Sequence, residues 1–305
     1  MGRITPTIYK DQIDIIDGIV VPFIKTPSDI VCPHFWELRW AFGCPFNCAY
    51  CYLQGTGRGT KNPKYRSITK VKNAIIKAFK HEYFLQHPSI FNSGELSDSL
   101  MNPSYMRQIA DLFETQDKHK LLLLTKSNKV EWLIKEPRKQ TIASFSLNAT
   151  EVWERWEKGT PSPQKRIEAA KKLVEAGYEV RLRIDPIFPI SNWKTHYEDL
   201  VYSVFSELSS DPNRITLGTP RGLAKTLMFA KDRSWEKIAF TDNPEYTGWG
   251  KKAPTSLRKE IFLFLYDKIA DLGFDKSMIA MCKETRSMWK ELGLNPNNCR
   301  CNCIW

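Results

Sequence analysis

No stretch of the sequence is apolar for the roughly 20 residues that a membrane-spanning helix requires. The chain also begins without the charged segment and the long apolar segment of a secretory signal. We therefore expect a cytoplasmic protein with no membrane partner. Linkers and internal repeats are missing as well. The 305 residues thus fit either one large α/β domain or a domain with an appendage, and they are enough to bury a sizeable core.

Disulfide bonds are the next feature that the sequence argues against. Its eight cysteines occur without an export signal, which is typical of metal ligation rather than of disulfide frameworks. Thiolates that hold iron oxidise readily. The cysteine content therefore predicts an oxygen-poor, anaerobic working environment.

Acidic residues are outnumbered by basic ones, and the formal net charge is +11. A basic surface favours solubility, but it also suits an anionic partner such as a nucleotide or nucleic acid. Basic residues gather at 61–72 and at 165–172. The second group falls on a predicted helix, where such runs are commonly a solvated face. Charge alone therefore leaves both interpretations open.

Three cysteines fall within eight residues, in a loop that follows the short apolar run 35–40. Cys44, Cys48 and Cys51 could bind one iron–sulfur cluster from this single loop. A [4Fe–4S] cluster needs four thiolates for complete protein ligation, so three would leave one iron open to another ligand. A zinc knuckle or a redox pair is the alternative for C-x2-C. Zinc sites usually contain two such pairs, however, and the next cysteine cluster lies far away in the sequence.

Strands and helices are predicted to alternate along most of the chain. The predicted strands are 35–40, 89–93, 121–126, 141–147, 178–184 and 214–218, and the predicted helices are 68–84, 105–114, 130–135, 163–176 and 195–209. This alternation implies parallel strands with right-handed crossovers. From about residue 234 the pattern changes to a long helix at 255–272 and a cysteine-rich tail. We therefore predict an N-terminal segment (1–35), an α/β domain (36–233) and a C-terminal extension (234–305).

Polar residues follow several predicted strands at their carboxyl ends, where parallel barrels bind their ligands. These residues are Ser93, Gly94, Glu95, Lys126, Ser146, Asn148 and Arg183. A glycine lets the backbone approach a ligand closely, and a carboxylate can accept hydrogen bonds from an ammonium group. The alternatives are an ordinary turn at Ser93-Gly-Glu95 and a solvent-facing strand end at Lys126.

The C-x3-C-x2-C spacing, with the aromatic Tyr50 before its third cysteine, resembles the signature of radical S-adenosylmethionine (SAM) enzymes. In that family the open iron of a [4Fe–4S] cluster binds the amino and carboxylate groups of SAM. Electron transfer from the cluster then yields a 5′-deoxyadenosyl radical. The resemblance implies a partial (β/α)6 barrel of TIM type, and a Gly-Gly-Glu-like motif at Ser93-Gly-Glu95 that holds the SAM amino group. It also implies a reducing partner such as flavodoxin or ferredoxin.

One branch of this superfamily, spore photoproduct lyase and its relatives, resembles the chain over roughly residues 36–225. The matching stretches are 93–98, 124–126, 145–148, 159–160 with Arg166, 176–177, and 185–187 with Trp193 and Tyr197. By this resemblance Lys126 and Ser146 contact SAM. The repair lyases keep a cysteine after the second strand that returns a hydrogen atom to the product, whereas residues 94–98 contain none. This departure argues against strict repair of spore photoproduct.

The C-terminal tail holds three cysteines in a C-x-C-x-C pattern. Cys299, Cys301 and Cys303 combine with Cys282 to give a complete ligand set for a second [4Fe–4S] cluster or for an all-cysteine zinc site. The spacing is tight for a zinc ribbon, so we favour an auxiliary cluster. The eighth cysteine, Cys32, is interpreted as a buried thiol, with a hydrogen donor or an extra ligand as alternatives.

We therefore predict a radical SAM enzyme in which Cys44, Cys48 and Cys51 initiate the chemistry. Its substrate is expected to be a nucleoside, a nucleotide or a nucleic acid that loses a hydrogen atom, and the second cluster would assist oxidation or sulfur insertion. The alternatives are a peptide or small-metabolite substrate, DNA repair of the spore photoproduct lyase type, and a non-enzymatic, metal-stabilised nucleic acid binder.

Overall fold

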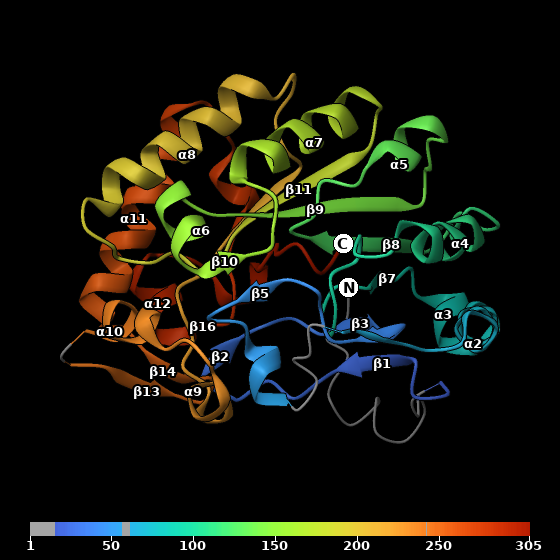
Figure 1. The fold of residues 1–305 in the computed structure, drawn as a ribbon, viewed down its shortest axis with the longest axis horizontal. Helices are drawn as coiled ribbons and strands as arrows, with labels where there is room; N and C mark the ends of the chain where they lie inside the picture. Colours follow the sequence, from blue (N-terminus) through green and yellow to red (C-terminus); the bar gives the residue numbers. More distant parts are fainter. Residues whose placement is uncertain (1–15, 57–61, 242) are drawn as a thin grey trace.

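A computed structural model describes residues 16–56, 62–241 and 243–305, so the first fifteen residues of the predicted N-terminal segment lie outside the described residues. One curved sheet of eight strands organises the molecule, and helices lie along its outer side (Figure 1). In order across the sheet, the strands are β1 (Val20–Phe23), β3 (Phe35–Leu38), β7 (Ile90–Asn92), β8 (Lys120–Thr125), β9 (Thr141–Leu147), β11 (Glu179–Ile184), β12 (Arg214–Leu217) and β15 (Ile279–Met281).

The strands from β3 to β15 are mutually parallel, and only β1 is antiparallel, pairing Val20 with Leu38. This arrangement confirms the predicted α/β class with a mostly parallel sheet. Strand β9 is buried at every position, as expected for a parallel strand that is covered on both faces.

Helices follow the strands in the predicted alternation. They are α2 (Ile68–Lys80), α3 (Glu82–Gln86), α4 (Pro103–Phe113), α5 (Glu131–Lys135), α6 (Thr150–Trp156), α7 (Pro163–Glu175), α8 (Trp193–Glu207), α9 (Ala224–Phe229), α10 (Ser234–Phe240), α11 (Thr255–Asp271) and α12 (Arg286–Glu291). The Ser162 side chain caps α7, and Pro163 occupies its first turn. Gly177, with φ +81°, ends that helix in the left-handed conformation that glycine tolerates. Among the described residues, no helix is long and apolar enough to cross a membrane.

Short elements connect segments that are far apart in the sequence. They are β2 (Ile30–Val31), β4 (Ala41–Phe42), β5 (Asn47–Cys48), η1 (Tyr52–Thr56), β6 (Lys64–Tyr65), β10 (Glu157–Lys158), β13 (Glu245–Thr247), β14 (Gly250–Lys252), η2 (Lys276–Met278), β16 (Glu284–Thr285) and η3 (Pro296–Asn298). Strand β5 pairs with β10, which ties the cysteine loop to the segment after α6. Strand β2 pairs with β16, which joins the first part of the chain to the last.

The predicted C-terminal extension contributes to the same sheet, because β15 pairs with β12 through Ile279 and Ile215. A short run of Ile-Ala-Met gave no sign of this strand in the sequence. The division into 1–35, 36–233 and 234–305 stays a prediction, but the described part of 234–305 packs as a continuation of the barrel.

The C-terminal tail enters the interior of the barrel, and Figure 1 places the end of the chain inside the arc of strands. Asn302 is fully buried there. Its side-chain amide donates to Ser144 Oγ and to the Leu182 carbonyl, at 2.9 Å each, and its Oδ1 accepts from Thr216 Oγ1 at 2.7 Å. Arg181 donates to the Asn302 carbonyl at 2.8 Å. The tail is therefore part of the core.

Replacing Asn302 with alanine should lower the free energy of unfolding by about 2 kcal/mol, because Ser144, Thr216 and a carbonyl would lose buried partners. Urea unfolding followed by circular dichroism measures this loss. Asn298→Ala, at an exposed tail position, is the matched control and should leave stability unchanged. Equal stability of the two variants would contradict the buried position of the tail.

Candidate active site

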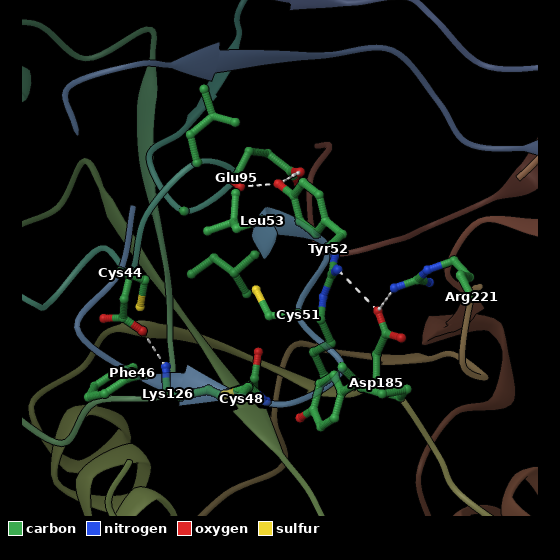
Figure 2. Close-up of a pocket in the computed structure, with 18 of the residues that line it drawn as sticks. Cys44, Phe46, Cys48, Cys51, Tyr52, Leu53, Glu95, Lys126, Asp185 and Arg221 are labelled. Carbon is green, nitrogen blue, oxygen red and sulfur yellow. Dashed lines mark hydrogen bonds and ion pairs between the residues drawn. The ribbon is translucent and has the colours of Figure 1, made fainter. Parts of the chain in front are cut away.

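The three clustered cysteines line a cavity of about 280 Å³ at the carboxyl ends of the parallel strands. Figure 2 shows Cys44, Cys48 and Cys51 on one side of this pocket and the Asp185–Arg221 pair on the other. The predicted residues that also line it are Tyr50, Gly94, Glu95, Lys126, Ser146 and Arg183. Ser93 and Asn148 are buried just outside the lining. The fold therefore brings the predicted strand ends together around the cysteine loop.

The cysteine loop has the donor set and the spacing for an iron–sulfur cluster. All three thiols are free, and the backbone N–H of Cys51 donates to the Cys48 carbonyl at 3.1 Å. Within the described residues, no three Cys, His, Asp or Glu side chains converge on a single metal ion. Three thiols on one loop would ligate three irons of a [4Fe–4S] cluster and leave the fourth iron open.

The protein alone does not favour ionised thiols in this loop. Burial raises the pKa of Cys44, Cys48 and Cys51, and the nearby Glu157 raises that of Cys48 further. The Lys126 ammonium group offsets part of this effect at Cys48 and Cys51. Metal coordination must therefore supply the remaining stabilisation of the thiolates, so metal binding would release protons.

A buried carboxylate, Glu157, holds the cysteine loop in place. It lies opposite Cys48 in the β5–β10 pair. Its carboxylate accepts hydrogen bonds from Arg166 Nη2 at 2.6 Å, Lys126 Nζ at 3.0 Å and the Tyr50 hydroxyl. Burial opposes its ionisation, but Lys126 and Arg166 outweigh burial and lower the pKa of Glu157 to about 2.

Glu157 could not be recognised from the sequence because it lies in a stretch of charged residues, which is typical of a solvent-exposed helix end. The only available signal was the matching Gly159-Thr160 stretch with Arg166, which lies beside it. Asn148, predicted to contact the cofactor, instead donates to Glu157 Oε1 at 3.3 Å and to the Pro186 carbonyl at 2.9 Å. Its cofactor contact stays a prediction.

Asp98 lines the same pocket and connects two of the segments that form its wall. Its carboxylate accepts from Thr125 Oγ1 and from the Lys126 backbone N–H, each at 2.7 Å, so it binds the loop after β7 to the end of β8. Burial raises the pKa of Asp98, although these hydrogen bonds oppose the rise. In the sequence Asp98 belongs to the matching stretch 93–98, but it is not among the predicted site residues.

The Ser93-Gly94-Glu95 segment is held by its own neighbours. A Cβ atom at Gly94 would lie 2.5 Å from Leu124 Cβ, so glycine allows this loop to pack directly against β8. Glu95 accepts from Asn92 Nδ2 at 3.3 Å, and its backbone carbonyl accepts from the Tyr52 hydroxyl. Close packing therefore explains the glycine. The role of Glu95 toward the SAM amino group stays a prediction.

The opposite wall of the pocket is cationic and aromatic. Asp185 accepts from Arg221 Nη2 at 3.0 Å. Lys283 Nζ lies 4.7 Å from the centre of the Phe23 ring and 4.9 Å from that of Trp249. Lys283 and Trp249 come from the C-terminal extension. Their place at the pocket depends on strand pairing that the sequence did not reveal.

A second, much smaller cavity of about 10 Å³ lies beside the first. Cys32, Cys282, Cys301 and Cys303 line it, and Cys299 does not. Both cavities share Glu95, Arg183 and Lys283 in their walls. The Arg183 guanidinium, predicted to contact SAM, donates to Cys282 Sγ at 3.5 Å and to Cys303 Sγ at 3.4 Å. Burial raises the pKa of Cys32 to about 12.

The fold and the three-thiol loop define a radical SAM protein. The family model for spore photoproduct lyase matches residues 34–218, and the chain belongs to this family. Spore photoproduct lyase of Bacillus subtilis is 31% identical over 185 residues, which are 58% of this chain and 52% of the relative. That of Clostridium acetobutylicum is 26% identical over 178 residues, 57% of this chain and 52% of the relative. The chain thus spans about half the length of the curated relatives it matches.

Solved structures show the same fold. A spore photoproduct lyase complexed with dinucleoside spore photoproduct superposes with a TM-score of 0.67 at 20% identity, covering 81% of this chain and 75% of that chain. Streptococcus suis SuiB bound to S-adenosylmethionine superposes with a TM-score of 0.52 at 12% identity, covering 82% of this chain and 50% of that chain. The predicted membership of the radical SAM superfamily, and of its spore photoproduct lyase-like branch, is confirmed.

We expect Glu157→Gln to lower the free energy of unfolding at pH 7.5 by an amount on the order of 3 kcal/mol. The wild-type carboxyl is ionised there, and its pKa is lowered from 4.5 to about 2 in the folded protein. Its contribution is complete above pH 4.5 and declines as the pH falls toward 2. Urea unfolding at pH 7.5 and pH 3.5 should therefore show a smaller difference at pH 3.5. A difference that grows on acidification would contradict this assignment.

Proposed function

We propose that this protein cleaves SAM reductively to a 5′-deoxyadenosyl radical, which abstracts hydrogen from a thymine dinucleoside lesion in DNA. The observation that carries the proposal is the pocket itself. The three cysteines that suit an open cluster face a wall of cations and aromatic rings across about 280 Å³. Structural neighbours bind AdoMet and dinucleoside spore photoproduct. This supports DNA repair, which the sequence analysis gave as an alternative, over hydrogen abstraction from an unspecified nucleoside.

Within this proposal, Cys44, Cys48 and Cys51 would hold the [4Fe–4S] cluster, which when bound supplies the electron that cleaves SAM. Lys126 places a positive charge beside the cluster loop, and Glu157 fixes its ammonium group at 3.0 Å. This positioned charge suits the SAM carboxylate. Flavodoxin or ferredoxin is the proposed reducing partner.

The cationic wall is proposed to bind the nucleic acid. Arg221 and Lys283 can contact phosphate or carbonyl oxygens, and Phe23 and Trp249 offer ring faces on which a base can stack. Such groups suit an anionic dinucleotide better than a peptide or an apolar metabolite. Glu95 stands in the loop where the repair lyases have their donor thiol. The product radical would therefore be quenched by one electron from the second cluster, which the reducing partner replaces, and by one proton.

We also propose that a second [4Fe–4S] cluster takes ligands from the cysteines predicted for it, Cys282, Cys299, Cys301 and Cys303. All four are buried, and two of them contact Arg183 in the wall of the substrate pocket. A redox centre there could take up or supply an electron as the substrate radical is resolved.

The direct test is anaerobic reconstitution with iron and sulfide, followed by SAM, dithionite and dinucleoside spore photoproduct. We expect 5′-deoxyadenosine and restored thymidines by mass spectrometry, and only background levels of both from Cys48→Ala. Formation of 5′-deoxyadenosine with an unaltered lesion would contradict the proposed substrate but would still support SAM cleavage at the cluster. A wild-type protein that binds no iron would overturn the whole proposal.

Lys283→Met should weaken binding of the lesion dinucleotide, which carries a phosphate, about tenfold, the loss expected from one charge-assisted contact. Methionine keeps apolar bulk between Phe23 and Trp249 while it removes the charge. Binding is measured by titration calorimetry, and SAM cleavage without the lesion, which should be unchanged, serves as the control. Equal affinity of the variant and the wild type would show that this wall does not bind substrate.

A further inference from the structure

The pairing of β2 with β16 brings two cysteines together from opposite ends of the chain. Glu284 lies opposite Val31, and Thr285 lies opposite Ile30. Cys32 directly follows β2, and Cys282 lies two residues before β16, so this pairing places both cysteines on one small cavity. The tail inside the barrel supplies Cys301 and Cys303 to the same small cavity. Cys299 forms a side-chain hydrogen bond with Cys301, but it is not among the residues that line the cavity.

The charges around these thiols leave a positive excess at the sulfur atoms. Arg183, Arg221 and Lys283 surround the site, whereas the carboxylates that pair with them are only Asp185 and Glu95 in the described part of the chain. The two arginines share Asp185, at 3.5 Å and 3.0 Å. Three cations with two carboxylate partners leave a net positive charge beside the sulfurs, and Arg183, the buried one of the three, contacts two of them directly.

Hydrogen-bond donors point directly at the sulfur atoms. Arg183 donates to Cys282 and Cys303, and Asn92 Nδ2 donates to Cys303 Sγ at 3.6 Å. The Nε of Arg183, which is 9% exposed, has no hydrogen-bond partner among the described residues. Neutral thiols that serve only as small apolar side chains do not require a buried guanidinium against them. Metal-bound thiolates accept such hydrogen bonds and balance the charge.

We infer that Cys32, Cys282, Cys301 and Cys303 are the ligands of the second [4Fe–4S] cluster, with Cys299 outside the set. This inference rests on the second cluster of the proposed function and specifies its site. Four thiols are the complete protein ligand set of a [4Fe–4S] cluster. With about 10 Å³ between them, the sulfurs have room for about one water molecule, so the cysteine side chains must turn outward as a cluster assembles.

The site can be tested in a chain whose first cluster has been removed by Cys44→Ala, Cys48→Ala and Cys51→Ala. After reconstitution this parent chain should bind about four irons, whereas the wild type should bind about eight. Adding Cys282→Ala and Cys303→Ala should reduce iron to background. Adding Cys299→Ala instead, the matched control from the same tail, should leave both the iron content and the electron paramagnetic resonance (EPR) spectrum of the reduced cluster unchanged.

Cys32 itself is tested by Cys32→Ala in the same parent chain. Three thiols can still hold a cluster, but one iron becomes open, so imidazole should change the EPR spectrum of this variant and not that of the parent. Cys32→Ser, which keeps the side-chain volume, repeats the test if the alanine variant is unstable in thermal unfolding. If imidazole leaves the EPR spectra of both Cys32 variants unchanged and Cys299→Ala loses iron, the inference is wrong. The ligands would then be the four cysteines predicted from the sequence.

The result is separable from the proposed function. Failure of the wild type to cleave SAM while the parent chain retains four irons would overturn the proposed function and leave the second site standing. Zinc in place of iron in the parent chain would overturn the inference.

Discussion

The buried ion pairs of Glu157 are the interaction on which the rest of the site depends. One carboxylate without solvent contact accepts from Arg166, Lys126 and Tyr50, which come from a helix, a strand end and the cysteine loop. Removing one partner from such a network leaves a buried charge without compensation. The network therefore fixes the loop of Cys44, Cys48 and Cys51 against the strand ends before any cluster binds. It also keeps the Lys126 charge in the pocket.

The second constraint is the path of the last residues of the chain. Asn302 and the two tail cysteines on either side of it fill the barrel interior below the pocket, held by Arg181 and by hydroxyl groups of the strands. The tail is thus part of the core, and its cysteines also form part of the wall of the smaller cavity. Because the tail fills the barrel interior, its thiols lie only one layer of side chains away from the larger pocket. Glu95, Arg183 and Lys283 form this layer, since they line both cavities.

Local patterns in the sequence predicted much of this molecule, and the reason is physical. Apolar runs such as 121–125 form buried parallel strands, and three thiols on one loop act as a unit at any position in a fold. What the sequence did not show depends on pairings between distant segments. Glu157 looked like part of a solvated helix end, and Cys32 gained its neighbours only through two-residue strands. Neither contact leaves a periodic signal.

The most direct measurement of the central claim is EPR spectroscopy of the reduced cluster with and without SAM, in a chain that carries Cys282→Ala and Cys303→Ala. Only the loop of Cys44, Cys48 and Cys51 can then contribute a signal. If three thiols leave one iron open for SAM, its addition should change the g-values of that signal. A signal that SAM leaves unchanged, or the absence of an iron signal altogether, would contradict the account.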